Sequence, residues 1–172
     1  MKDTNFVNPD GLDSQGHVTT INDLLILSKE VLENIELLTI IMKPSFISDI
    51  GGSDKVYLNT NQLINENYLG LKTGWTKEAG LTFIGVNQSN NRNILTIVNK
   101  SIVNDKKDNH FLDTKILYSV SIDSFINKIL IDDKEDIYRI RNSTQTINIK
   151  STEPWIVFGN KYTKNKFYLN KV

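Results

Sequence analysis

The residues best equipped for chemistry form one run, Lys72-Thr73-Gly74-Trp75. A ligand that ends in a carboxylate needs a cation and a hydroxyl to hold that end, and Lys72 and Thr73 supply both. Gly74 has no side chain, so a bound main chain can approach the strand closely there. The backbone N–H of Trp75 can then face an oxyanion that develops beside it. One interpretation of the run is therefore a strand that can bind a carboxylate and face an oxyanion.

The bare triplet also has a plainer interpretation. Lys-Thr-Gly occurs by chance in many proteins, where it is a solvated Lys beside a Gly that ends a strand. Trp75 is then ordinary core or rim material, and Lys77 and Glu78 are solvated turn residues. The surrounding sequence has to decide between the two interpretations.

The residues before this run predict two helices. Apolar side chains at helical spacing predict a helix over residues 21–34 with one buried face. Thr20 and Asp23 stand at its start in a pattern close to a capping box, with Asp in the place of Glu. A second short helix is expected over 36–43, ended by Pro44.

The run itself lies in a strand-rich block. Residues 68–75 predict a strand, and the alternation on either side of residues 88–92 predicts a hairpin with a five-residue turn. Residues 111–125 predict a helix that packs on this sheet. Shorter strands are expected at 56–58, 137–140, 147–149 and 155–158, and residues 59–67 read as a polar loop.

Composition limits the class of protein. The chain has 172 residues, of which 39% are hydrophobic and 23% charged, with 20 acidic and 20 basic side chains. This balance gives no footprint for nucleic acid. The lack of cysteine excludes disulfides, thiolate metal sites and a cysteine nucleophile, and no cofactor or metal is expected. No run approaches the about 20 apolar residues that span a bilayer, and the amino terminus lacks the apolar stretch of a secretory signal.

Two longer motifs carry a family resemblance. The segment that begins at Thr4 reads TNFVNPDGLDSQGHVTTINDL, and residues 70–80 read Gly-x-Lys-Thr-Gly-x-Thr-x-x-Ala-Gly. Both, in this order, resemble the serine-type D-alanyl-D-alanine carboxypeptidases, the low-molecular-mass penicillin-binding proteins, over roughly residues 1–126. Class A β-lactamases share the Lys-Thr-Gly strand but not the Asn-Pro-x-Gly-Leu and Gly-His segment.

The resemblance implies a fold and a domain division. The expected class is α/β (α+β), a partial DD-peptidase/β-lactamase-like fold with helices on an antiparallel sheet. Residues 1–126 are expected to be the carboxy-terminal part of the catalytic domain. Residues 127–172 resemble the start of the β-rich domain that these enzymes often append, in a short or incomplete form.

The resemblance also implies chemistry. In the complete enzyme a Ser attacks the carbonyl between the two terminal D-Ala residues of a peptidoglycan stem peptide, and water then hydrolyses the acyl-enzyme. Lys72 would attract the terminal carboxylate, Thr73 would donate to it, and the N–H of Trp75 would form half of the oxyanion hole. β-Lactams are expected ligands of the complete enzyme, which the family places outside the cytoplasmic membrane.

The chain departs from the family pattern at the nucleophile. No Ser-x-x-Lys occurs in the 172 residues, and the family carries it upstream of the position that matches Met1. Ser89-Asn90-Asn91 fits Ser-x-Asn and Tyr57-Leu58-Asn59 fits a Tyr-x-Asn variant, but neither has the family's position. We interpret both as coincidence in an Asn-rich chain.

The two histidines receive different interpretations. His110 stands where some family members have an Arg that helps to bind the substrate carboxylate, and a neutral imidazole is a poorer partner for an anion than a guanidinium. A plain surface histidine is the alternative at this position. For His17 we expect a hydrogen-bonded residue that fixes a loop beneath the first helix.

The sequence leaves three hypotheses about the protein. In the first, the chain is part of a carboxypeptidase and is inactive alone. In the second it is a non-catalytic remnant or a module that binds wall peptides, and in the third it is one half of a split enzyme whose amino-terminal half comes from elsewhere. A sheet edge left open by a missing half would favour association.

Overall fold

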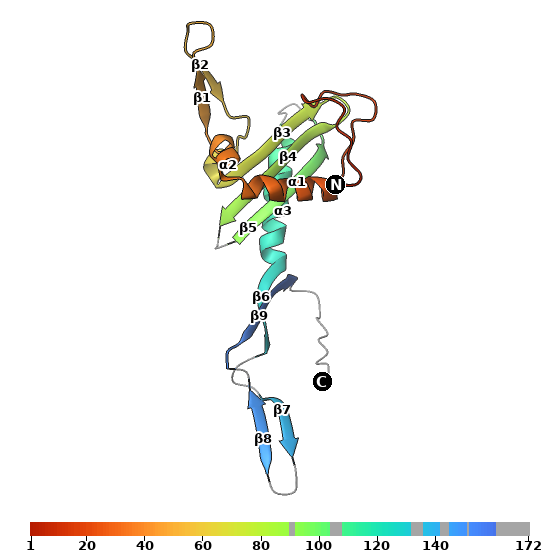
Figure 1. Cartoon of the computed structure of the whole chain (residues 1–172), viewed down its shortest axis with the longest axis vertical. Coiled ribbons are helices and arrows are strands. Elements are labelled where there is room, and N and C mark those ends of the chain that lie inside the picture. Colours follow the sequence, from red (N-terminus) through yellow and green to blue (C-terminus); the bar gives the residue numbers. More distant parts are fainter. Residues whose placement is uncertain (90–91, 104–107, 132–135, 142–144, 151, 161–172) are drawn as a thin grey trace. The chain divides into compact units, whose positions relative to one another are not determined.

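The computed structural model describes residues 1–89, 92–103, 108–131, 136–141, 145–150 and 152–160 (Figure 1). The chain divides into two compact units, Met1–Tyr118 and Ser119–Val172. The expected domain boundary near residue 126 stays a prediction.

Two capped helices open the first unit. Helix α1 (Ile21–Glu33) begins at Thr20, whose hydroxyl accepts the N–H of Asp23 at 3.2 Å. Helix α2 (Ile35–Ile41) begins at Asn34, whose side chain accepts the N–H of Leu37 at 2.9 Å. The bounds of both helices confirm the sequence prediction within two residues at each end.

The expected buried apolar face of α1 is wrong. Its buried residues are Asp23 and Ser28, while Ile21 and Leu25 on that face are exposed. Helical spacing of apolar residues predicts the helix but not what covers it.

An antiparallel sheet in the order β3-β4-β5 follows (Figure 1). Its strands are β3 (Tyr68–Thr76), β4 (Gly80–Ser89) and β5 (Arg92–Ser101). The predicted five-residue turn is wrong in extent, because β4 and β5 stay paired as far as Ser89 and Arg92. The polar residues at these strand ends still pair across the two strands, because the hydrogen bonds between strands join backbone groups and do not depend on side-chain polarity. Asn90 and Asn91, and with them most of the Ser-x-Asn pattern, lie outside the described residues.

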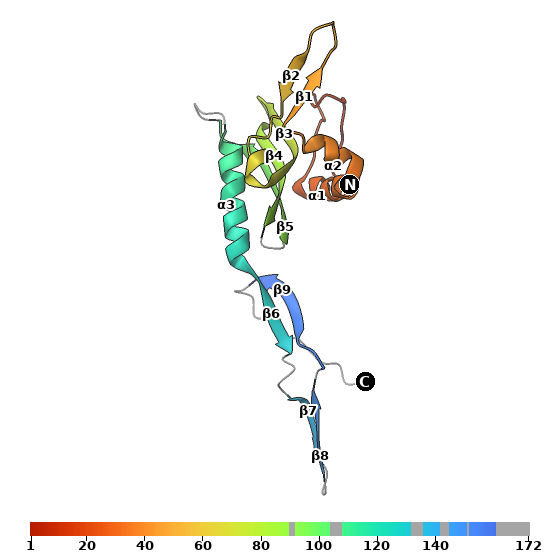
Figure 2. The same cartoon turned by 90° about the vertical axis from the view of Figure 1, so that its left-hand side faces the viewer.

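Helices cover both faces of this sheet (Figure 2). Helix α1 contacts β5 and α2 contacts β3, whereas α3 (Asn109–Ser124) lies along the opposite face. The buried core beneath α3 consists of Leu63, Tyr68, Phe83 and Phe111, with Tyr118 packed against it. The rings of Phe83 and Phe111 meet edge to face, with 5.1 Å between centroids. The prediction of helices packed on an antiparallel sheet is confirmed.

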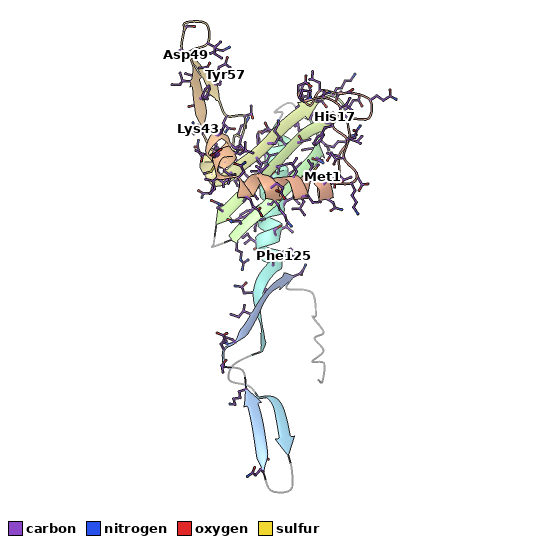
Figure 3. All side chains as sticks on the ribbon, viewed as in Figure 1. Met1, His17, Lys43, Asp49, Tyr57 and Phe125 are labelled. Carbon is purple, nitrogen blue, oxygen red and sulfur yellow. The ribbon has the colours of Figure 1, made fainter. Side chains whose placement is uncertain are left out.

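A separate hairpin follows α2 in the chain and precedes the three-stranded sheet. It pairs β1 (Ser45–Ser48) with β2 (Lys55–Leu58). Figure 3 shows Asp49 at its tip and Tyr57 along it, with Lys43 at its base. The sequence predicted β2 but missed β1. A 3-10 turn, η1 (Ile64–Glu66), then leads into β3.

The second unit consists of two antiparallel pairs. Strand β6 (Phe125–Ile131) pairs with β9 (Trp155–Asn160), and β7 (Asp136–Arg141) pairs with β8 (Thr146–Lys150). The sequence predicted β7, β8 and β9 but missed β6. Because all four elements are strands, the expectation of a β-rich carboxy-terminal segment is confirmed. Among the described residues, no helix is long and apolar enough to cross a membrane.

Candidate functional site

Strand β3 carries the predicted functional run at an edge of its sheet. Thr73 and Gly74 pair with Phe83 and Thr82 of β4. On its other side β3 has no strand partner among the described residues. A β-bulge interrupts the pairing between Gly70 and Lys72. Because a bulge changes the direction of the residues that follow it, it helps set how the run faces the open edge.

The side chains of Lys72 and Thr73 make local contacts. The Lys72 ammonium donates to the carbonyl oxygen of Thr73. The Thr73 hydroxyl lies 2.6 Å from the hydroxyl of Thr60. Lys72 is exposed and Thr73 is half-buried, so both polar groups can be reached from solvent.

Gly74 has a packing reason of its own. A Cβ at this position would lie 2.5 Å from Oγ1 of Thr82 on the neighbouring strand, closer than real Cβ atoms approach other atoms. Packing against the Thr82 side chain is therefore one reason for a glycine at this position. Close approach of a substrate main chain at Gly74 stays a prediction, as does the oxyanion role of the Trp75 N–H. The Trp75 side chain is 61% exposed.

A cavity of about 190 Å³ lies beside β3. It brings Lys72 and Thr73 together with the end of α2 and with the loop before η1. Gly74, Trp75 and His110 are not among its lining residues, which are Ile40, Ile41, Asn59, Thr60, Asn61, Gly70, Leu71, Lys72, Thr73 and Phe83. Of the predicted site residues, the structure places two in one pocket.

The loop 59–61 is the part of this pocket that sequence reasoning missed. Asn59 donates to the carbonyl oxygens of Ile41 (2.9 Å) and Lys43 (2.8 Å) and accepts the N–H of Asn61. The Asn61 amide donates to Tyr68 O and accepts the Leu63 N–H, each at 3.0 Å. The only sequence signal was the pair of Asn residues, whose side chains commonly bond to nearby backbone.

His110 lies in the aromatic core. It is 5% exposed, and its ring centroid lies 3.9 Å from that of Phe111 and 6.3 Å from that of Phe83. Its Nδ1 is buried and has no hydrogen-bond partner among the described residues. Burial lowers the pKa of this imidazole, although Asp108 and Asp113 act in the opposite direction.

The surface interpretation of His110 is therefore wrong, because the aromatic rings enclose it. Its role toward a substrate carboxylate stays a prediction. A buried imidazole that favours the neutral form gives that role no support.

His17 holds the loop that precedes α1, as expected. The imidazole Nδ1 of His17 accepts a hydrogen bond from the backbone N–H of Val7 at 3.1 Å, and the backbone N–H of His17 donates to Ser14 O at 3.0 Å. The ring of Phe6 lies 5.4 Å away, centroid to centroid. Figure 3 shows His17 within this loop.

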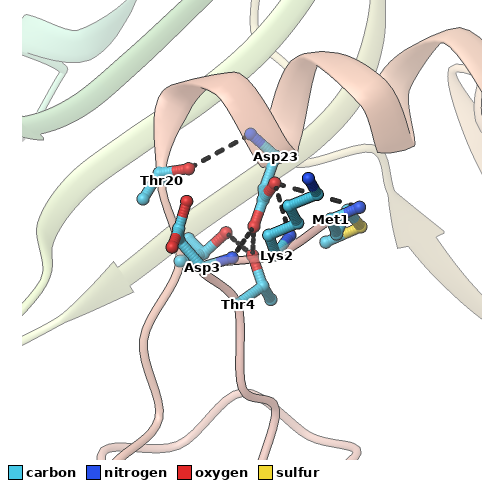
Figure 4. Close-up of polar contacts among 7 residues, drawn as sticks. Met1, Lys2, Asp3, Thr4, Thr20 and Asp23 are labelled. Atoms are coloured by element: carbon cyan, nitrogen blue, oxygen red, sulfur yellow. Dashed lines mark hydrogen bonds and ion pairs between the residues drawn. The ribbon is translucent and has the colours of Figure 1, made fainter.

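Asp23 ties the amino terminus to α1 (Figure 4). Its buried carboxylate accepts the N–H groups of Lys2 (3.1 Å) and Asp3 (2.8 Å) and the hydroxyl of Thr4 (2.7 Å). The hydrogen bond from Thr4 is the main reason why the pKa of Asp23 lies below its usual value. Only half of the expected capping box forms, since this carboxylate bonds to residues 2–4 instead of the N–H of Thr20.

Comparisons with known proteins agree with the motifs. The model of the peptidase S11 family, D-alanyl-D-alanine carboxypeptidase, matches residues 1–102. D-alanyl-D-alanine carboxypeptidase DacF of Bacillus subtilis is 30% identical over 111 residues, which are 57% of this chain and 26% of that protein.

Solved structures give the same result. Penicillin-binding protein D2 from Listeria monocytogenes in the cefotaxime-bound form has a TM-score of 0.60 and 32% identity, over 71% of this chain and 49% of that one. The carboxypeptidase DacD from Francisella tularensis has a TM-score of 0.70 over 94% of this chain and 52% of that one, at 16% identity, which shows a shared fold.

The chain thus spans about a quarter of the Bacillus relative and about half of each solved structure. The family match covers more than half of the chain and includes both sequence motifs. The chain belongs to the D-alanyl-D-alanine carboxypeptidase family.

Proposed function

We propose that this chain supplies the carboxylate-binding strand of a serine-type D-Ala-D-Ala carboxypeptidase of peptidoglycan metabolism. One observation carries the proposal: Lys72 and Thr73 lie together on β3, the edge strand of the described sheet, and line one pocket. A cation beside a hydroxyl suits the free carboxylate of a stem peptide that ends in D-Ala-D-Ala.

The chemistry divides among the residues of the strand. Lys72 attracts the terminal carboxylate and Thr73 donates a hydrogen bond to it. The N–H of Trp75 and the N–H of the attacking serine form the oxyanion hole, where losing one donor typically costs ~100- to 1000-fold in rate. The serine attacks the peptide carbonyl, the last D-Ala leaves with a proton, and water hydrolyses the ester.

The serine must come from outside these 172 residues, because they contain no Ser-x-x-Lys. We therefore expect the chain alone to form no covalent adduct with a penicillin. The β-lactam complex of the Listeria protein supports β-lactams as ligands of the complete site. The family's action on peptidoglycan supports a place outside the cytoplasmic membrane.

A second candidate is one half of a split enzyme, or a module that binds wall peptides without cleaving them. Exposed apolar side chains on α1 and α2 favour association with a further segment. Ile26 is 47% exposed on α1, and Ile35 and Ile40 are 78% and 65% exposed on or at the ends of α2. Such a segment, when it carries the nucleophile, would complete the site.

Calorimetric titration tests the proposed ligand. An acyl-D-Ala-D-Ala peptide should bind, and its carboxy-terminal amide should bind more weakly. Lys72→Ala and Thr73→Val should each reduce the preference for the carboxylate, whereas Lys77→Ala, a lysine that lies outside the pocket lining, serves as the control. Equal binding of acid and amide by the unchanged chain would refute the proposal.

A further inference from the structure

Thr60 is the direct partner of the Thr73 hydroxyl. The two Oγ1 atoms lie 2.6 Å apart, and both residues line the 190 Å³ pocket. A hydroxyl has one proton to donate and two lone pairs that accept. In this pair one hydroxyl therefore donates a hydrogen bond to the other. The accepting hydroxyl can still donate a hydrogen bond to a third group.

The backbone on either side of Thr60 is fixed by amide side chains. Asn59 bonds to the carbonyl oxygens of Ile41 and Lys43, and the Asn59 N–H donates to Pro44 O at 2.8 Å. These bonds attach the loop to the end of α2 and the segment after it.

The other side of the loop is fixed to β3. Asn61 is 3% exposed and bonds to Tyr68 O and to the Leu63 N–H. Gly70 makes room for it, because a Cβ at Gly70 would overlap the Asn61 side chain. Thr60 therefore stands between two anchored neighbours, and its distance from β3 is set by the fold.

A ligand anion decides which hydroxyl donates. With the pocket empty, either Thr60 or Thr73 can be the donor. A carboxylate held by Lys72 accepts hydrogen bonds only, so it draws the proton of Thr73 toward itself. Thr73 then has to accept from Thr60, and a hydroxyl that accepts one bond becomes a better donor in the next.

We propose that Thr60 is a positioning residue for carboxylate recognition. It donates to Thr73, fixes the rotamer of that side chain and directs its proton to the anion. The inference rests on the proposed function, because it takes the terminal carboxylate of the peptide as the ligand. It adds a residue from outside the Lys-Thr-Gly strand to the machinery that selects an acid over an amide.

Three variants of the full chain test this role. Thr60→Val removes the hydroxyl and keeps the branched shape, and Thr60→Ser keeps the hydroxyl. Thr39→Val is the matched control, since the Thr39 hydroxyl donates to Ile35 O on α2 and lies outside the pocket lining. Thermal melting of each variant shows whether the fold is retained.

The first readout needs no ligand. Three-bond couplings to the Thr73 methyl group report its χ1 rotamer by NMR. We expect one dominant rotamer in the unchanged chain, in Thr60→Ser and in Thr39→Val, and a mixture in Thr60→Val. The same single rotamer in Thr60→Val would overturn the inference.

The second readout is the affinity ratio between an acyl-D-Ala-D-Ala acid and its amide. Thr60→Val should weaken acid binding about 3- to 10-fold, as expected for one hydrogen bond near the surface, and leave amide binding unchanged. Thr60→Ser should restore the ratio. If the unchanged chain has no preference for the acid, the proposed function fails. If it has that preference and Thr60→Val keeps it, the inference alone fails.

Discussion

The Asn61 side chain should contribute more stability than two solvent-exposed hydrogen bonds would. It accepts the Leu63 N–H and donates to Tyr68 O, each at 3.0 Å, and the residue is 3% exposed. In Asn61→Ala both backbone groups lose their partner inside the protein. A buried polar group left unsatisfied costs about 1–3 kcal/mol.

Two such groups set an upper limit of about 6 kcal/mol. Asn61 also lines the 190 Å³ pocket, so water can enter the vacated space and bond to one of the two groups. We therefore expect Asn61→Ala to lower the free energy of unfolding by about 2–4 kcal/mol. That is a large part of the about 5–15 kcal/mol by which a domain is stable.

Asn8 provides a matched control. Its side chain also accepts one backbone N–H, from Gly11 at 2.8 Å, and donates to one carbonyl, of Leu12 at 2.9 Å. Asn8 is more accessible to solvent than Asn61, so water can replace both bonds. Asn8→Ala should cost about 1 kcal/mol or less.

Urea unfolding of the full chain measures both costs. The amide signal of Phe83, at the centre of the first unit, follows that unit alone. A loss in Asn61→Ala no larger than the loss in Asn8→Ala would refute the reasoning that burial sets the cost.

Three further predictions concern the sheet and the two titrating groups. Gly74→Ala should destabilise the first unit by about 1–3 kcal/mol in urea unfolding, and adding Thr82→Ala, which removes the clashing hydroxyl, should recover most of it. The pKa of His110 is lower in the folded chain than its unfolded value of about 6.5, so the unfolded chain binds more protons and stability should fall as pH drops below about 6.5. His110→Phe should flatten that part of the pH–stability curve; an unchanged slope would contradict the assignment. The pKa of Asp23 is also lowered on folding, so its contribution is present above about pH 4 and lost as pH falls through the folded pKa. Asp23→Asn should therefore destabilise the chain most at pH 7 and progressively less as pH falls below about 4, and an equal effect at every pH would show that charge is not the cause.

Local signals explain what the sequence predicted well. Helix α1 has a capping residue, Thr20, and an apolar face at helical spacing, and both act within a few residues of each other. The Lys-Thr-Gly strand was recognisable because its flanking residues form a longer motif. The class of fold and the strand that carries the candidate site could therefore be predicted.

The missed strands lacked such signals. Strand β1 has four residues, three of them exposed, so it shows no alternation of buried and exposed positions. Strand β6 begins directly after α3, and its residues Phe125–Ile131, apolar except for Asn127 and Lys128, do not by themselves distinguish a strand from the end of a helix.

The rest of the pocket depends on contacts between residues far apart in the chain. Thr60 meets Thr73 across 13 positions, and Asn59 reaches Ile41 across 18. No pattern in the loop 59–61 specifies those partners. The burial of His110 likewise follows from packing of α3 on the sheet, since a single His beside a loop gives no sign of its environment.

An NMR titration of the unmodified chain with an acyl-D-Ala-D-Ala peptide tests the central claim most directly. If β3 holds the terminal carboxylate, the amide signals of Lys72, Thr73 and Trp75 should shift in a saturable way with the acid and much less with its amide. Shifts of equal size with both peptides, or no shifts in β3 at millimolar peptide, would contradict the account.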